Sequence, residues 1–291
     1  MKLRFVLQAM RIKNWIKNSL IFIPIIFSGV LFEDDNLFIV LGAFLSFSLI
    51  ASSIYIINDV RDAENDRKHA PKCSRPIAAG NLAAGKALLI SGIIAGGGYS
   101  LAFWIGKTTG FVFWPLFELT AYFLLNLGYS MGLKNFPLID VFLLALGFML
   151  RVFYGGSILG IGVSNWVYLT IFSGALYLSL GKRKNELLYY GDAARESLKN
   201  YTLEFLDKGM QIFLTLCLVF YSLACASYDT AAAKMGVNLI WTVPLVTLIC
   251  LKYYLDISRM TEGDPVGIIF KDKYLLLLIT AYGLSMIILL N

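Results

Sequence analysis

Three oxygen-bearing side chains recur at intervals of four residues in the most polar part of the chain. Asn58, Asp62 and Asp66 lie between two strongly apolar segments. If the preceding helix continues through them, they share one face and are spaced about 6 Å apart. Hard oxygen ligands at that pitch suit Mg2+, which keeps several waters and bridges to substrate phosphates. The alternative is a solvated helix cap whose acids pair with nearby bases; the asparagine, a third acid at Asp59 and the membrane-edge position favour the metal site.

Basic side chains accompany these acids in the same segment and recur in a later one. They are Arg67, Lys68, Arg75, Lys182 and Arg183. Arginine forks match phosphate oxygens, and lysine adds a compact positive charge, so we expect an anionic substrate. Two alternatives stay open for the later segment. Its bases could simply snorkel at the membrane interface, or Lys182 could pair with Glu186 four residues on.

A short polar connection between two apolar segments supplies Lys134, and Asp140 follows shortly after Pro137. Pro137 would begin the next helix, and an acid near the first turn suits the helix dipole. Capping and a role as a ligand are equally supported for Asp140. For Lys134, membrane topology and phosphate binding explain the residue about equally well.

The composition is that of a polytopic membrane protein. Of 291 residues, 58% are hydrophobic and only 15% are charged, which places the chain outside the ordinary soluble classes. Nine stretches are long enough to cross a bilayer core of about 30 Å. Their approximate limits are 19–32, 37–57, 86–106, 109–129, 138–158, 165–181, 209–228, 237–257 and 273–290. We therefore predict an all-α fold of nine transmembrane helices around a central cavity, forming a single domain over residues 1–291.

The distribution of basic residues predicts the orientation. With the N-terminus inside, 22 Lys and Arg fall on the inner side and only Lys107 and Lys234 on the outer side. The positive-inside rule therefore places the N-terminus and the polar loops, 58–85 and 182–208 above all, in the cytoplasm. Residues 1–18 are basic and amphipathic and are predicted to lie on the inner leaflet as an interfacial helix. They are not a cleavable signal, since no small-residue cleavage site follows a short apolar core.

Several other classes lack support in the residues. The four cysteines show no C-x-x-C spacing, so we expect neither a zinc site nor a disulfide framework, and His69 has no partner at metal-ligand spacing. No aromatic platform or recognition-helix pattern indicates nucleic-acid binding. A transporter or lipid-binding protein is disfavoured by the odd number of spans and the absence of an evident inverted repeat.

One arginine, Arg151, lies inside a predicted span, where it must pair or face water. Counted from the outer boundary, Arg151 and Glu118 of the preceding span differ in depth by roughly 3 Å. We therefore predict an ion pair between Glu118 and Arg151 with a structural role.

Taken together, the chain resembles the UbiA-type intramembrane prenyltransferase superfamily. That family carries an N-D-x-x-D-x-x-x-D motif after its second span, matched here by Asn58, Asp59, Asp62 and Asp66 and trailed by the R-P-I-A-x-G sequence of residues 75–80. Quinone and haem prenyltransferases usually carry a second aspartate-rich motif after the sixth span. In this chain that position reads K-R-K-N-E, residues 182–186.

The resemblance extends to the decaprenyl-phosphate phosphoribosyltransferase branch of that superfamily. The matching motifs are W-x-K-N at 15–18, Y-S-x-x-L-K at 129–134, Asp140 with Arg151, and G-K-R-x-x-E at 181–186. The resemblance implies transfer of 5-phosphoribose from phosphoribosyl diphosphate to a polyprenyl phosphate, with Mg2+, in the cytoplasmic membrane of a bacterium. The alternative is a UbiA-type enzyme that joins a prenyl diphosphate to an aromatic acceptor. Homo-oligomerisation is left open.

The candidate site residues follow from the motifs and their chemistry. The candidate metal ligands are Asn58, Asp62 and Asp66, and the candidate catalytic residues are Asp62, Asp66, Lys134 and Asp140. The candidate substrate-binding residues are Lys17, Asn18, Arg67, Lys68, Arg75, Tyr129, Lys182, Arg183, Glu186 and Tyr201. An ionised lipid phosphate is already a nucleophile at neutral pH, so the reaction needs no general base.

Overall fold

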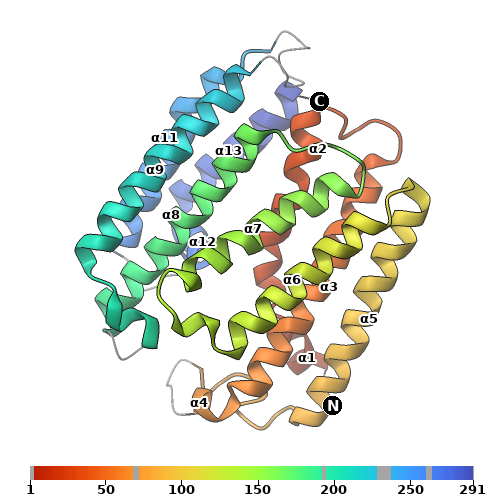
Figure 1. The fold of residues 1–291 in the computed structure, drawn as a ribbon, viewed down its shortest axis with the longest axis vertical. Helices are drawn as coiled ribbons and strands as arrows, with labels where there is room; N and C mark the ends of the chain where they lie inside the picture. The colour runs from red at the N-terminus through yellow and green to blue at the C-terminus, as the bar shows by residue number, and fades with distance from the viewer. Residues whose placement is uncertain (1–2, 68–71, 192–194, 228–236, 260–263, 291) are drawn as a thin grey trace.

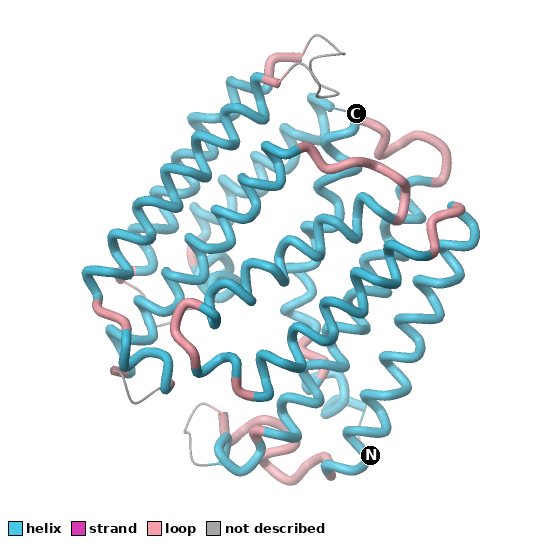
Figure 2. The backbone as a smooth tube through the Cα atoms, viewed as in Figure 1, coloured by secondary structure: helices cyan, strands magenta, loops and turns pink. Residues whose placement is uncertain are grey.

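The computed structural model describes residues 3–67, 72–191, 195–227, 237–259 and 264–290. Within these ranges the chain forms helices and loops and no strand (Figure 2). The N-terminal half comprises α1 (Leu3–Ala9), η1 (Ile12–Phe22), α2 (Ile23–Ser28), α3 (Asn36–Arg61), α4 (Ala63–Arg67), α5 (Ala84–Thr109), α6 (Phe113–Met131), η2 (Leu133–Asn135) and α7 (Ile139–Ser157). The C-terminal half comprises α8 (Asn165–Tyr190), η4 (Glu196–Asn200), α9 (Leu203–Ala226), η5 (Leu239–Thr242), α11 (Val243–Ile257), α12 (Pro265–Lys271) and α13 (Lys273–Leu290).

The long helices pack around the bundle in an order that returns to its start. α3 packs on α5 and α6, α6 on α7, α7 on α8, α8 on α9, and α9 on α11. α11 then contacts α13, and α13 contacts α2, which itself packs on α7. α1 lies at one end of this bundle, and the last turn of α13 lies at the other (Figure 1).

Six helices among the described residues are long and apolar enough to cross a membrane. They are Asn36–Arg61, Ala84–Thr109, Ile139–Ser157, Leu203–Ala226, Leu239–Ile257 and Lys273–Leu290. α6 and α8 also correspond to predicted spans, and the first predicted span is divided between η1 and α2. The prediction of a multi-pass helical membrane protein is therefore confirmed, whereas the number of nine spans stays a prediction.

The prediction of one continuous amphipathic helix over residues 1–18 is wrong, because two helices, α1 and η1, form this segment; its placement on the inner leaflet stays a prediction. α1 ends at Ala9, and Arg11 adopts a left-handed backbone with φ 51°. The chain then turns into η1, which buries Asn18 and Ile21 against α3 and α7. The segment enters the bundle because Arg11 turns toward α3, where its guanidinium pairs with Asp59.

Candidate active site

The predicted register of the first polar segment is confirmed by its backbone. Although α3 ends at Arg61, the amide of Asp62 bonds to the Asn58 carbonyl at 2.9 Å, and the amide of Asp66 bonds to the Asp62 carbonyl at 2.8 Å. The helical i to i+4 pattern thus continues through the cap into α4, and Asn58, Asp62 and Asp66 follow one another at single-turn steps.

The three aspartates of this segment each face a base. Arg75 Nη1 lies 2.6 Å from Asp66 Oδ2 and 3.2 Å from Asp59 Oδ1, so one guanidinium bridges two buried carboxylates. Asp62 is more exposed and lies 3.3 Å from the Lys134 ammonium. We call the acids and their bases, Asp59, Asp62, Asp66, Arg11, Arg75 and Lys134, the acidic cluster.

The amide of Asn58 is held from a different helix. Ser130, near the end of α6, donates a hydrogen bond to its side-chain oxygen. Lys134, which reaches Asp62, follows in η2 just beyond α6. The α6 end and η2 therefore complete the cluster built on α3 and α4.

A second cluster forms where α7 and α8 meet the η4 loop. The Asp140 carboxylate is fully buried and accepts hydrogen bonds from Tyr201 (2.8 Å) and Ser197 (3.1 Å). Arg183 Nε lies 3.1 Å from Asp140, an ion-pair distance that is not aligned as a hydrogen bond, and its Nη1 pairs with Glu186. Burial raises the pKa of the Tyr201 phenol, which keeps it protonated as the donor to Asp140.

Tyr129 and Arg195 extend this second cluster toward the first one. Arg195 Nη1 donates to the Tyr129 hydroxyl at 2.7 Å, and the guanidinium also lies 5.9 Å from the centre of the ring. Because Tyr129 belongs to the same helix end as Ser130, α6 contributes adjacent residues to both clusters.

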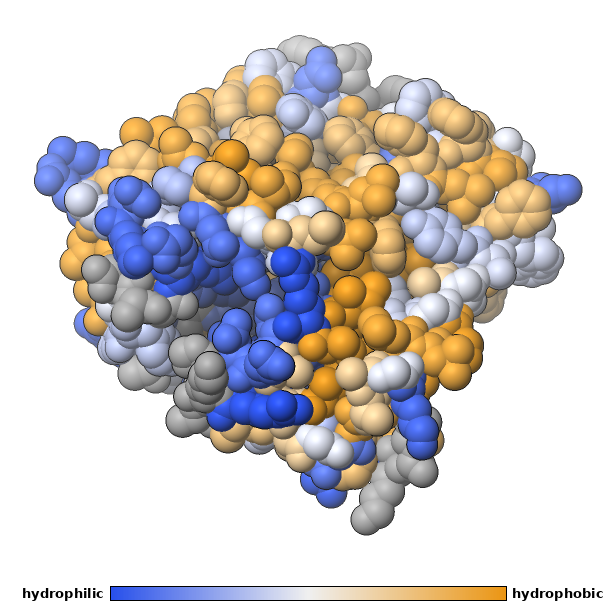
Figure 3. Space-filling model, turned by 60° about the horizontal axis from the view of Figure 1, so that its bottom comes forward, coloured by the Kyte–Doolittle hydropathy of each residue, from blue (hydrophilic) through white to orange (hydrophobic). Residues whose placement is uncertain are grey.

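Charges of both clusters act on one lysine, Lys72. Lys72 has a lowered pKa, first because the surrounding protein displaces water and then because of the nearby Arg75 charge. Smaller effects on this pKa come from Asp66 of the acidic cluster and from Arg195 and Glu186 of the second cluster. Figure 3 shows hydrophilic side chains gathered around a hollow on one face of the molecule.

A third group of charges joins the N-terminal segment to the C-terminal one. Lys17 Nζ lies 2.9 Å from Asp264 Oδ1, and Lys182 Nζ lies 3.8 Å from the same oxygen. Burial alone would raise the pKa of Asp264, but the two ammonium groups outweigh it, and the pKa lies below its ordinary value. Asp264 therefore carries a full negative charge between the two lysines at neutral pH.

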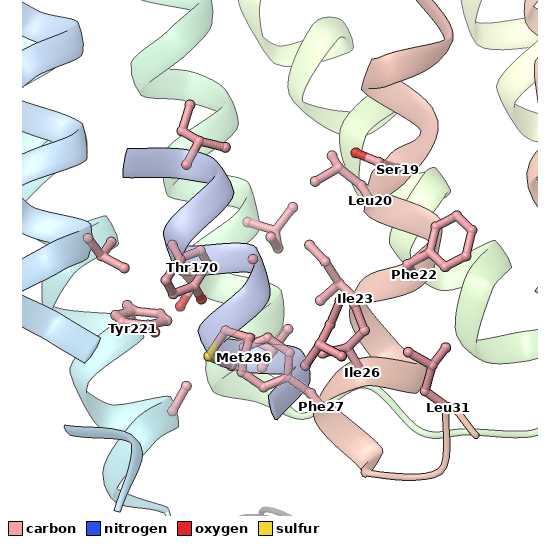
Figure 4. A pocket seen from close by; sticks show the side chains of 18 of the residues that line it. Ser19, Leu20, Phe22, Ile23, Ile26, Phe27, Leu31, Thr170, Tyr221 and Met286 are labelled. Carbon is pink, nitrogen blue, oxygen red and sulfur yellow. The ribbon is translucent and has the colours of Figure 1, made fainter. Parts of the chain in front are cut away.

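An apolar groove begins directly beside these charges. A cavity of about 440 Å³ is lined by Lys17 and Pro265, and a cavity of about 710 Å³ continues it to Phe27 and Leu31. The two cavities share the lining residues Ser19, Leu20, Thr170, Ile171 and Ile279. In Figure 4, Ile23 and Ile26 of α2 and Met286 of α13 point into the larger cavity.

The model of the UbiA prenyltransferase family matches residues 21–269. The chain belongs to this family. It is therefore a multi-pass membrane transferase, as the resemblance in its motifs predicts.

Curated relatives and solved structures agree with the family assignment. Decaprenyl-phosphate phosphoribosyltransferase of Mycolicibacterium smegmatis is 32% identical over 290 residues, covering 95% of this chain and 89% of the relative. The protein of the same name from Corynebacterium glutamicum is 32% identical, covering 95% of this chain and 83% of the relative. A UbiA homologue from Archaeoglobus fulgidus bound to GPP and Mg2+ has the same fold, with a TM-score of 0.74 at 18% identity and coverage of 97% of this chain and 99% of that one.

The UbiA-family acidic cluster suits a divalent cation by its donor chemistry. Among the described residues, no three acidic, cysteine or histidine side chains converge as a ready-made metal site. Asn58 and Asp62 nevertheless present oxygens at one helical step, and the group facing Asp62 is a single lysine at 3.3 Å. A UbiA homologue from A. fulgidus that shares this fold, with a TM-score of 0.70 at 19% identity and coverage of 97% of this chain and 99% of that one, was solved bound to Cd2+.

The predicted ion pair between Glu118 and Arg151 is wrong. Glu118 accepts a hydrogen bond from Ser157, whereas Arg151 Nε donates to Asn18 Oδ1 at 2.8 Å. The remaining Arg151 nitrogens bond to the Gly147 carbonyl (2.6 Å) and the Tyr122 hydroxyl (2.9 Å). Similar depth in the membrane did not bring the two groups together, because helix rotation points Arg151 toward η1.

The structure places most of the predicted site residues in the charged clusters described above. Asn18 instead bonds to Arg151 and Ser48 inside the bundle. Arg67 lies beside Asp66 on α4, but its Nε donates to the Ala78 carbonyl at 3.1 Å. Lys68 lies outside the described residues.

Several residues of the three clusters have no counterpart in the sequence-based site. They are Arg11, Ser130, Arg195, Ser197 and Asp264. Of these, Asp264 carried a signal, since it is an acid just before a proline-initiated helix, but its partners are remote in sequence.

Proposed function

We propose that the protein transfers 5-phosphoribose from phosphoribosyl diphosphate to a polyprenyl phosphate, with release of diphosphate and with Mg2+. The observation that carries the proposal is the separation of two charged sites. An acidic cluster suits a metal-bound diphosphate. Lys17 lines an apolar groove and shares the Asp264 carboxylate with a second lysine, Lys182. The names of the curated relatives support the same reaction.

The acidic cluster would receive the donor substrate. Asn58, Asp62 and Asp66 would hold Mg2+, which when bound neutralises charge on the diphosphate leaving group. Lys134 and Arg75 already belong to the acidic cluster, so they would turn from the carboxylates toward the phosphate oxygens when the donor binds. We assign the largest part of the rate acceleration by the protein to stabilisation of the departing diphosphate.

The groove would receive the acceptor lipid. Its apolar walls suit a polyprenyl tail, and the charges at its end suit a phosphate monoester. The monophosphate would reach Lys17 and Lys182.

In the reaction, the bond between ribose C1 and the diphosphate oxygen breaks, and a bond forms between C1 and an oxygen of the lipid phosphate. The developing positive charge on C1 lies between two anions held by the protein. The attacking oxygen is already ionised, so no protein group needs to remove a proton.

The decisive experiment is incubation of the purified protein with ribose-labelled phosphoribosyl diphosphate, Mg2+ and a polyprenyl phosphate, followed by organic extraction. We expect label in the organic phase and an equal amount of diphosphate. Consumption of a prenyl diphosphate with an aromatic acceptor, and no transfer of ribose label, would instead establish the second type of UbiA reaction.

A further inference from the structure

Asp264 is the least expected member of the three charged groups, because a carboxylate between two phosphate-binding lysines opposes the binding of an anion. It lies at the N-cap position of α12, and its side chain is about one-third exposed (32%). Lys17 and Lys182 come from η1 and α8, so three separate elements converge on this one carboxylate.

Asp264 lies beside the apolar groove. Lys17, one member of the ion pair, and Pro265, which directly follows the other member, both line the 440 Å³ cavity. The ion pair therefore joins η1 to α12, two of the elements that line the groove. A lipid head group whose tail fills the groove would meet Asp264 together with the lysines.

The charges at this position set a limit on the head group. The two lysines and Asp264 sum to one net positive charge, whereas the lysines alone would carry two. A phosphate monoester carries one to two negative charges, and a diphosphate monoester carries more. Each added negative charge on the head group is repelled by the fixed carboxylate nearby, so the repulsion grows with the number of charges.

We propose that Asp264 is a specificity-determining residue that makes the acceptor site select a polyprenyl monophosphate over a polyprenyl diphosphate. Before lipid binds, its carboxylate is the counter-ion of Lys17 and Lys182. A bound monophosphate pairs with the two lysines in place of Asp264, whose carboxylate stays nearby as a fixed negative charge. This charge repels a diphosphate head group more strongly, because the diphosphate carries more negative charge. This inference rests on the proposed function, because it assumes a phosphorylated lipid as the acceptor.

The test compares wild type with Asp264→Asn. The asparagine retains the size and the capping capacity of the side chain while it removes the charge. We expect the KM for polyprenyl phosphate to fall several-fold with little change in kcat. The inhibition constant of polyprenyl diphosphate should fall more, by about tenfold, so that discrimination between the two head groups is reduced.

The matched control is Asp272→Asn at the other end of α12. Asp272 also pairs with a lysine, Lys252, and caps the next helix through the Leu275 amide at 2.9 Å. It does not line the groove cavities described above. We expect this variant to leave both the KM and the inhibition constant unchanged.

Two outcomes would overturn the inference, and both differ from failure of the proposed function. A higher KM for the lipid in Asp264→Asn would mean that the carboxylate only holds the groove walls together. Equal changes for the two head groups would mean that it does not discriminate between them. If wild type transfers no ribose label to polyprenyl phosphate, the proposed function itself is wrong, and the variant comparison does not arise.

Discussion

Arg151 Nε donates a hydrogen bond to Asn18 Oδ1 at 2.8 Å, which ties the middle of α7 to η1. The guanidinium is buried and also lies over the rings of Phe47, Tyr122 and Phe148, within 5.4 Å of each ring centre. Among the described residues no carboxylate pairs with it. Since Asn18 directly follows Lys17, this buried arginine fixes the position of the lysine at the groove mouth.

The first prediction concerns the coupling between these two residues. In a double-mutant cycle of Asn18→Ala and Arg151→Met, we expect a coupling free energy of about 2 kcal/mol. Either substitution alone already removes the buried hydrogen bond to the charged guanidinium, so the double variant does not lose it a second time. The measurement is unfolding of the detergent-solubilised protein. As a control, Glu118→Gln should be additive with Arg151→Met, since the two residues share no partner. Coupling to Glu118 in place of Asn18 would restore the ion pair predicted from the sequence.

The second prediction tests the acidic cluster. Asp62→Asn or Asp66→Asn should lower kcat about a hundredfold or more, because the carboxylate charge is lost from the proposed Mg2+ site. Turnover and membrane insertion would be measured in parallel, with the Mg2+ concentration varied. Glu64→Gln is the matched control, because Glu64 is an exposed acid on the same short helix. Near-normal rates in both aspartate variants would remove the metal assignment.

The third prediction separates two adjacent basic residues that the sequence treats alike. Lys182→Gln should raise the KM for the lipid and leave stability almost unchanged, since Lys182 is partly exposed at the groove mouth. Arg183→Gln should lower the free energy of unfolding by about 3 kcal/mol, because it leaves the buried Asp140 carboxylate without its cation. Thermal unfolding and lipid titration distinguish the two effects. The same change in KM for both variants, with no loss of stability, would place Arg183 in substrate binding.

The fourth prediction is a pH dependence of stability that involves Asp264. The folded-state pKa lies below the ordinary carboxyl value, so the unfolded chain takes up this proton first as the pH falls. The stabilisation is therefore complete above the unfolded pKa of about 3.9 and is lost as the pH falls through the lower folded pKa. The difference in unfolding temperature between wild type and Asp264→Asn should be constant from pH 5 to 7 and shrink below about pH 4. A difference that is largest at pH 3 would contradict the ion pair.

Local spacing was enough to predict the backbone arrangement of the polar segment that contains Asn58, Asp62 and Asp66. The interval of four between Asn58, Asp62 and Asp66 is preserved because i to i+4 hydrogen bonds are a property of the backbone itself. Hydropathy likewise determines that the chain enters a membrane, and the motifs around Asp62 and Lys182 identify the family. These features follow from residues close together in sequence.

Only the tertiary structure decided which distant groups meet. Depth along a span predicted Glu118 as the partner of Arg151, but the rotation of α7 directs Arg151 to Asn18. Helix rotation is set by side-chain packing around the whole bundle. Adjacent residues Lys182 and Arg183 point to different partners, Asp264 and Asp140, because successive residues on a helix are about 100° apart. The lysine pair at the groove exists because η1, α8 and α12 converge, and no interval within the sequence encodes that convergence.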